Sequence, residues 1–337
     1  MAAAAPVRPL TVMARAGDIL AWARARWLEQ ALGVTVETIP GRQPEPVPEG
    51  FSVVVHGAGP VDESATVACF DGLEGVPDTA ATALAVALDR VLVPSEDTAQ
   101  RFRALWPQAR AQVTPAQAPM LGDWPSTVER AVVRTRQRAK LGLPDRTRIV
   151  LGIGAVESLS GLIHFARLAT LTCERRTDIR FVWLGARTPD WERAHWLDVG
   201  LPVALRQLFL VADRSFAGWL LAADAYVGCR APGIHDAGVI EALGAGLPVC
   251  VETRASLPDV LRAAPCNDLV DEASGEAAFD WLTASLDGTQ LEADDARTDR
   301  ARQTLRCWDK GRAAVDFVNA CRIGSDAALS TGNDGND

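Results

Sequence analysis

The sequence predicts an α/β protein with two doubly wound, parallel-sheet domains. Short apolar runs rich in β-forming residues alternate with helical stretches along most of the 337 residues. The apolar runs are continuous rather than alternating with polar residues, which is typical of strands buried on both faces of a parallel sheet. One stretch without strand signals divides the series, and a chain of this length fits two domains of roughly 100–200 residues each.

The first domain is predicted over residues 1–120. Its apolar runs predict strands at residues 10–14, 34–39, 51–56, 66–70 and 90–94. A broad apolar face predicts a helix over residues 19–32, and a second helix is predicted to begin after Ser95, a residue that caps helix N-termini well.

The second domain is predicted over residues 148–297, after a linker at 121–147 that is rich in Pro, Gly and Arg. Strands are predicted at 148–153, 179–184, 207–211, 225–228 and 248–252, and helices at 160–172, 190–197, 216–222 and 237–244. A last long helix is predicted at 298–323. The polar tail at 324–337 is predicted to be disordered.

Composition excludes several functional classes. The net charge of −9 argues against nucleic acid as the main partner, because binding to a phosphate backbone favours basic surfaces. The sequence has no run of about 18 apolar residues, so no membrane span is predicted. Its N-terminus lacks a signal-peptide pattern, and we therefore expect a cytoplasmic protein. The seven cysteines are scattered and the four histidines have no metal-binding spacing, so neither a disulfide framework nor a metal cofactor is expected.

Residues 237–252, AGVIEALGAGLPVCVE, resemble the donor-site segment of the GT-B retaining glycosyltransferases of family 4. Further segments resemble the same family in the same order, over most of residues 90–322: 91–99, 141–144, 149–154, 209–213, 221–227 and Trp308. The resemblance implies the GT-B fold, in which two Rossmann-like domains face each other across a cleft. It also implies sugar transfer from a nucleotide diphosphate sugar with retention of configuration, and a C-terminal helix that crosses back to the first domain.

Within this resemblance, Glu241 matches the glutamate that holds the nucleotide ribose, although a helix-capping or solvated role is the alternative. Gly17 matches a glycine under the donor phosphates, and Gly154 matches the end of the first strand of the second domain. Gly238 allows close approach of the backbone to the donor. We therefore predict these four residues to be donor-binding.

The donor site also departs from the family pattern. Two basic residues that bind the diphosphate in the family are replaced by Ala155 and Ser160, and a family glutamate is replaced by Gly233, with Asp236 or His235 as the nearest polar substitutes. Arg230 could supply the missing positive charge together with main-chain N–H groups of residues 230–238. The alternative for Arg230 is a solvated surface arginine.

On the acceptor side, His56 ends the predicted strand 51–56 and Asp71 follows the predicted strand 66–70, so both are expected at strand ends as candidate catalytic residues, with purely local hydrogen bonding as the alternative. Tryptophans and arginines of the first predicted helix could contact a membrane surface, although core tryptophans and solvated arginines are the more ordinary interpretation. These residues are Trp22, Arg24, Arg26 and Trp27.

The sequence therefore predicts a metal-independent glycosyltransferase with a nucleotide sugar as donor and a glycan, lipid-linked or protein acceptor. The sequence has no Asp-x-Asp pair at a predicted strand end, so we expect no divalent ion to take part. The alternative, motivated by Ala155 and Ser160, is a non-catalytic GT-B subunit that binds an acceptor or supports an active partner subunit. A sugar-nucleotide epimerase is a third possibility. The pair Gly152 and Gly154 lacks the third glycine of a dinucleotide-binding fingerprint.

Overall fold

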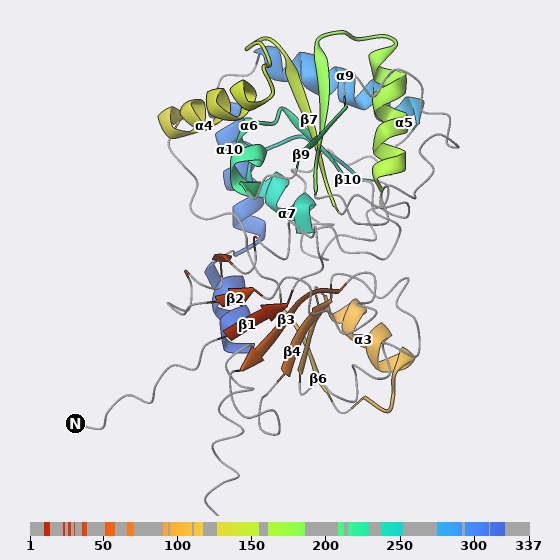
Figure 1. The fold of residues 1–337 in the computed structure, drawn as a ribbon, viewed down its shortest axis with the longest axis vertical. Coiled ribbons are helices and arrows are strands. Elements are labelled where there is room, and N and C mark those ends of the chain that lie inside the picture. Colours follow the sequence, from red (N-terminus) through yellow and green to blue (C-terminus); the bar gives the residue numbers. More distant parts are fainter. Residues whose placement is uncertain are drawn as a thin grey trace, which may run out of the picture. The chain divides into compact units, whose positions relative to one another are not determined.

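The structure is a computed structural model that describes residues 10–13, 23, 26–27, 30, 36–38, 51–57, 66–70, 90–93, 95–109, 111–116, 127–154, 161–185, 208–211, 215–228, 237–251, 275–291, 294–309 and 311–320. The chain divides into two compact units, each with its own sheet (Figure 1). The first unit comprises Met1–Ala16, Ala21–Pro119 and Lys310–Asp337, and the second comprises Gly17–Leu20 and Met120–Asp309.

The first unit contains a six-stranded sheet in the order β2-β1-β3-β4-β5-β6. The strands are β1 (Leu10–Met13), β2 (Val36–Thr38), β3 (Phe51–Gly57), β4 (Thr66–Phe70), β5 (Arg90–Val93) and β6 (Gln112–Pro115). The pairs β1–β2, β4–β5 and β5–β6 are parallel, as the sequence predicts. β6 has no counterpart among the predicted strands.

Strand β3 departs from the predicted parallel sheet, because it runs antiparallel to both β1 and β4. Only residues 58–65 connect β3 to β4. Such a connection is too short for the crossover of a dozen or more residues that parallel neighbours need, so the chain turns back as a hairpin. The register pairs His56 with Thr11 near the start of β1 and with Thr66 at the start of β4. His56 therefore lies at the amino edge of the neighbouring strands, not at the carboxyl edge where the prediction placed it.

In the first unit, α3 (Glu96–Leu105) and residues 311–320 are helical, and so are the described residues of the predicted helix 19–32, which are Ala23, Arg26, Trp27 and Gln30. The hydroxyl of Ser95 accepts a hydrogen bond from the Thr98 N–H at 3.1 Å, so Ser95 is the predicted N-cap. Phe102 and Trp106 of this segment are buried and pack edge to face, with ring centroids 4.8 Å apart. Trp27 packs against Phe317 in the same way, which supports a core role for that tryptophan.

The second unit contains a five-stranded sheet in the order β11-β10-β7-β8-β9, and all of its pairs are parallel. The strands are β7 (Arg148–Ile153), β8 (Ile179–Leu184), β9 (Leu208–Val211), β10 (Ala225–Gly228) and β11 (Val249–Val251). Their bounds match the predicted strands within one residue at each end. This is the doubly wound order, in which the chain starts in the middle of the sheet and builds outward in both directions.

Helices cover both faces of this sheet (Figure 1). They are α4 (Thr127–Lys140), α5 (Leu162–Cys173), α6 (Phe216–Ala222), α7 (Ala237–Gly244), α9 (Glu276–Leu291) and α10 (Asp294–Cys307). α5 and α9 bury their apolar faces in one core, with Phe165 and Leu282 against strand residues such as Phe181 and Val227. On the other face α4 packs against α6, and α10 packs against α7.

Helices α4 and α7 end in the same way because both are followed by Gly-Leu-Pro. Gly142 and Gly246 adopt positive φ angles of 62° and 68°. The next N–H, of Leu143 or Leu247, donates to a carbonyl five residues earlier, that of Arg138 or Ala242. This is the Schellman motif, in which glycine supplies the left-handed residue that stops the helix.

Three further differences from the sequence analysis concern helices. The predicted linker at 121–147 contains α4, which belongs to the second unit. Helix α9 was not predicted. The predicted helix at 298–323 is two helices, α10 and residues 311–320, separated near Asp309 and Gly311, residue types that favour helix ends. The predicted helix at 190–197 and the tail at 324–337 lie outside the described residues. Among the described helices, none is both long and apolar enough to cross a membrane.

Candidate active site

The order of the strands in the second sheet indicates where a ligand binds. β7 is the first strand of this unit, β8 and β9 follow on one side, and β10 and β11 follow on the other. The order therefore reverses between β7 and β10, and doubly wound sheets bind ligands at the carboxyl ends of the strands beside such a switch point. Here these ends are Ile153–Gly154 and Gly228, and α7 begins shortly after Gly228.

The backbone is closely packed at this edge because glycines leave room for it. A Cβ atom at Gly185, just after β8, would overlap the carbonyl oxygen of Gly154. A Cβ at Gly154 would lie 2.9 Å from the ring of Trp183, and one at Gly152 would lie 2.7 Å from it. Any side chain at these positions would displace the neighbouring strand or the ring. Packing within the second unit therefore requires these glycines, because Trp183 and the Gly154 carbonyl occupy the space that side chains would need.

Trp183 fills the space that the glycines leave under the end of β7. It pairs with Gly152 in the register of β7 and β8, and its side chain is 1% exposed. Its indole Nε1–H donates a hydrogen bond to the carbonyl oxygen of Gly154 at 3.0 Å. The first carbonyl after β7 is thus held by a buried tryptophan, a contact that sequence reasoning did not predict.

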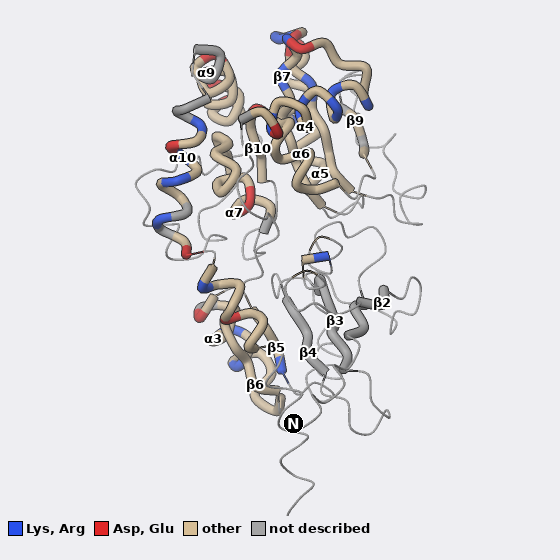
Figure 2. Tube along the Cα trace, turned by 90° about the vertical axis from the view of Figure 1, so that its left-hand side faces the viewer, with Lys and Arg blue, Asp and Glu red and all other residues tan. Residues whose placement is uncertain are grey.

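Glu241 is buried in the middle of α7, with 1% of its surface exposed. It is the only charged residue of this helix, whose other residues are Ala, Gly, Val, Ile and Leu, and it appears as the single acidic segment of α7 in Figure 2. This burial excludes the solvated alternative. A carboxylate in an otherwise apolar helix is costly unless it has polar partners, and Glu241 interacts with a partner within the structure. Its burial on the helix that follows the switch point makes it a candidate ligand-binding group.

The structure describes only part of the predicted site. Gly154, Gly238 and Glu241 all belong to the second unit, where Gly154 directly follows β7 and the other two lie on α7. The backbone of His56 is described, and it lies at the amino edge of the first sheet. The other predicted residues lie outside the described residues, so their roles stay predictions: Gly17, Asp71, Arg230, Gly233 and Asp236.

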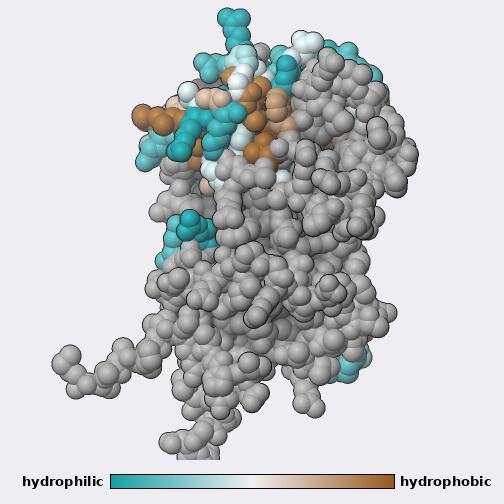
Figure 3. Space-filling view, in the orientation of Figure 1, coloured by the Kyte–Doolittle hydropathy of each residue, from teal (hydrophilic) through white to brown (hydrophobic). Residues whose placement is uncertain are grey.

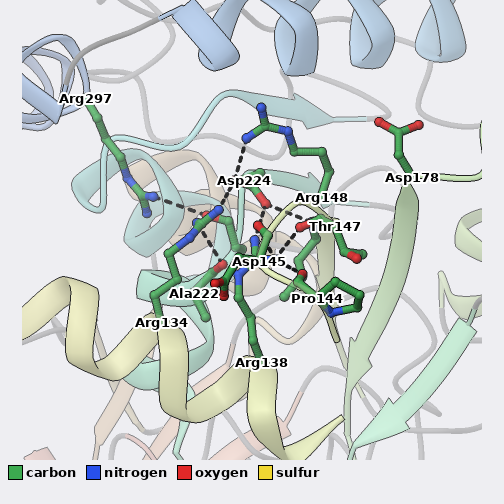
Figure 4. Close-up of polar contacts among 12 residues, drawn as sticks. Arg134, Arg138, Pro144, Asp145, Thr147, Arg148, Asp178, Ala222, Asp224 and Arg297 are labelled. Atoms are coloured by element: carbon green, nitrogen blue, oxygen red, sulfur yellow. Dashed lines mark hydrogen bonds and ion pairs between the residues drawn. The ribbon is translucent and has the colours of Figure 1, made fainter. Parts of the chain in front are cut away.

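At the opposite, amino edge of the second sheet lies a buried charge cluster that sequence reasoning missed (Figure 4). Asp224, just before β10, accepts hydrogen bonds from Arg134 at 2.7 Å, from Arg138 at 2.9 Å and from the Ile149 N–H at 2.8 Å. Arg148 pairs with the same carboxylate at 3.5 Å. Three arginines thus converge on one aspartate at the start of two adjacent strands.

Arg138 also donates to the carbonyl oxygens of Pro144, Asp145 and Thr147, which follow its own helix. Burial lowers the pKa of its guanidinium, and the positive charge of Arg134 lowers it further. The cluster ties α4 to β7 and β10 and lies at the amino edge of the strands, so we assign it a structural role.

Helix α4 contributes arginines to this cluster because polar side chains occupy its buried face and apolar side chains are exposed. Its buried face carries Arg130, Gln137 and Arg138, whereas Val128 and Val132 are 73% and 63% exposed. Figure 3 shows apolar and hydrophilic side chains mixed on the surface around this helix. Sequence patterning normally places arginines outside, which is why the cluster was not predicted.

Comparisons with known proteins give a consistent result for the fold. No known protein family and no curated protein matches the sequence. Among solved structures, a glycosyltransferase from Rickettsia africae is similar with a TM-score of 0.55 and 12% identity, over 91% of this chain and 81% of that one. Sucrose-phosphate synthase from Thermosynechococcus elongatus has a TM-score of 0.53 and 17% identity, over 75% of this chain and 63% of that one.

A third similar structure is HepE from Anabaena in complex with UDP and glucose. Its TM-score is 0.54 at 14% identity, over 76% of this chain and 70% of that one. Of the sucrose-phosphate synthase structure described above, this chain spans less than two thirds. At these identities the likeness concerns the fold, and it confirms the predicted class: α/β, GT-B, with Rossmann-like units.

Proposed function

We propose that the chain is a glycosyltransferase that moves a sugar from a nucleotide diphosphate sugar to a glycan, lipid-linked or protein acceptor. The observation that carries the proposal is the burial of Glu241 on α7, the helix that begins beyond the carboxyl end of β10 at the switch point. A buried carboxylate there is suited to accept hydrogen bonds from the ribose hydroxyls of the donor. The structural similarity to a glycosyltransferase and to HepE in complex with UDP and glucose supports the same class of donor.

The chemistry requires stabilisation of the leaving diphosphate. In our proposal the main-chain N–H groups of residues 230–238 and the N-terminus of α7 supply partial positive charge, and Arg230 supplies a full charge that can bind two phosphate oxygens. We further propose metal-independent transfer with retention, as in family 4, with Asp71 on the acceptor side.

The test measures binding of UDP, GDP and ADP to the parent protein and to Glu241→Gln by thermal shift and calorimetry. We expect one of these nucleotides to stabilise the parent, by roughly 2.7 kcal/mol at a hundredfold excess over Kd. Glu241→Gln keeps the side-chain volume but removes the charge, so Kd should rise about tenfold while Tm without nucleotide changes little. Glu276→Gln is the control, because Glu276 is exposed on α9 and pairs only with Arg175 among the described residues.

An unchanged Kd in Glu241→Gln would contradict the ribose-binding role. Failure of the parent to bind any of the three nucleotides would contradict a donor site. Nucleotide binding without transfer to any glycan, lipid-linked or protein acceptor would instead favour the non-catalytic subunit.

A further inference from the structure

One arginine of α10 holds the C-terminal ends of two helices, α6 and α7. Arg297 donates from Nε to the carbonyl oxygen of Ala245 at 3.1 Å, from one terminal nitrogen to Ala223 at 3.2 Å and from the other to Leu220 at 3.1 Å. Leu220 and Ala223 lie at the end of α6, and Ala245 directly follows α7. Carbonyls at helix ends lack intrahelical partners, and a single guanidinium here satisfies those of both helices that flank β10.

A second contact fixes the same end of α7 to α10. Arg300 donates from Nε to the carbonyl oxygen of Gly246 at 3.2 Å. Gly246 is the left-handed residue that ends α7, and a Cβ atom there would overlap the main-chain oxygen of Arg297. The backbones of α10 and of the α7 terminus are therefore in direct contact.

The electrostatics favour this arrangement. Burial lowers the pKa of the Arg297 guanidinium to about 9, with a further contribution from the charge of Arg130, so the group is still protonated at neutral pH. The carboxyl ends of helices carry partial negative charge, and a cation placed against two of them stabilises both. Arg297 makes these hydrogen bonds to carbonyl oxygens rather than to a carboxylate, which distinguishes it from the arginines around Asp224.

We call the three hydrogen bonds from Arg297 to the ends of α6 and α7 the clamp. It acts one helical turn away from Glu241, the candidate ribose-binding residue. The Ala245 N–H donates to the main-chain oxygen of Glu241 at 2.8 Å, and the Ala245 carbonyl accepts from Arg297. Helix α7 has eight residues and is therefore about 12 Å long, so fixing its C-terminus also fixes where Glu241 and the N-terminus lie.

We propose that Arg297 is a positioning residue for the donor site, acting by holding the C-terminus of α7 against α6 and α10. The inference rests on the proposed function, because it assigns Arg297 the task of placing Glu241 for a nucleotide. It does not require Arg297 to touch the ligand.

Arg134 provides a matched control on the other side of α6. It donates to the carbonyl oxygen of Ala222 at the end of α6 at 3.1 Å, and it pairs with Asp224 at 2.7 Å. Its described hydrogen bonds reach α6 but not α7, so its removal should weaken the unit without releasing α7. Arg302 provides a surface control. It lies on α10, its side chain is 67% exposed, and it pairs with Asp299.

The experiment compares Arg297→Met, Arg297→Lys, Arg134→Met and Arg302→Met with the parent. It measures Tm, the Kd of UDP, GDP and ADP well below the lowest Tm, and hydrogen exchange of a peptide covering residues 237–247. Arg297→Met should raise Kd about tenfold and speed exchange in that peptide, because a small displacement of binding groups is costly. Arg297→Lys should recover part of the affinity, since an ammonium keeps the charge but cannot reach all three carbonyls. Arg134→Met should lower Tm but leave both other readouts at the parent level.

The proposal is overturned if Arg297→Met binds nucleotide and exchanges at residues 237–247 like the parent. It is also overturned if Arg134→Met loses affinity to the same extent, since a general loss of stability would then explain both. If the parent binds none of the three nucleotides, the proposed function fails. Hydrogen exchange then tests the clamp by itself: faster exchange at residues 237–247 in Arg297→Met, but not in Arg134→Met, supports it, and parent-like exchange in Arg297→Met contradicts it.

Discussion

The amino and carboxyl edges of the second sheet differ in the groups that fill them. At the amino edge, Arg134, Arg138 and Arg148 surround Asp224, and the charged side chains there pair with one another. At the carboxyl edge Gly154 and Gly185 directly follow β7 and β8, Gly228 ends β10, and the next described helix along the chain, α7, carries a single charged residue, Glu241. The more highly charged edge is therefore the structural one, and the edge where doubly wound sheets bind ligands has glycines instead of paired charges at its described strand ends.

This difference shows why a cluster of buried charges is not by itself a binding site. The carboxylate of Asp224 is already paired with arginines and with the Ile149 N–H. A ligand would have to compete with these contacts. The carboxyl edge has instead a closely packed backbone. There β10 is followed along the chain by the start of α7, and helix starts favour anion binding.

Removing Asp224 should produce the largest effect on stability. Asp224→Ala leaves the buried Arg138 and the partly buried Arg134 without their carboxylate, and breaking a buried pair in this way costs about 3–5 kcal/mol. Asp178→Ala is the matched control, because Asp178 likewise directly precedes a strand and pairs with an arginine, yet its side chain is 42% exposed against 6% for Asp224. The control should cost about 1 kcal/mol or less.

Chemical denaturation of both variants measures these losses. Similar losses for Asp224→Ala and Asp178→Ala would contradict the structural role of the amino edge.

Adding a methyl group at the carboxyl edge should have the next largest effect. Gly185→Ala forces a Cβ atom into the carbonyl oxygen of Gly154, so the ends of β7 and β8 must separate. We expect a loss of about 3 kcal/mol in the free energy of unfolding, together with weaker nucleotide binding. Gly288→Ala in α9 is the control, since nothing lies within 4 Å of its Cβ position and alanine is the better helix former.

Gly288→Ala should stabilise the protein by about 0.5–1 kcal/mol. Urea titration gives both values. A Gly185→Ala variant as stable as the parent would show that the strand ends have room to move.

The sequence predicts the second sheet well because its strands are continuous apolar runs between turn residues. β7, β8 and β10 have their predicted bounds, and Ser95 caps α3 as predicted. The direction of β3 could also have been inferred, because residues 58–65 are too few for a crossover helix. Connection length was the signal that pattern reading did not use.

Other features depend on contacts between distant segments, which no local pattern encodes. The arginines of α4 are buried only because Asp224 lies 86 residues beyond Arg138 along the chain. The role of Arg297 depends on the ends of α6 and α7 meeting α10. Glu241 was found because it matches a family position, and its burial then removed the solvated alternative.

The smallest predicted effect concerns the hydrogen bond under the end of β7. Trp183→Phe keeps an aromatic ring beside Phe165 but removes the N–H that donates to the Gly154 carbonyl, so that carbonyl loses its described side-chain partner. We expect a loss of about 1 kcal/mol in stability and a rise of a few fold in the Kd of the nucleotide that binds the parent.

Phe165→Leu separates packing from hydrogen bonding in this comparison. Phe165 packs against Trp183 and Phe181, with ring centroids 5.2 and 5.3 Å away, but its side chain donates no hydrogen bond to Gly154. It should therefore lower Tm at least as much as Trp183→Phe, through lost packing, while leaving nucleotide affinity unchanged. If both variants weaken binding equally, the carboxyl edge responds to core packing in general. If only Trp183→Phe does so, the position of one main-chain carbonyl at the end of β7 contributes to the site.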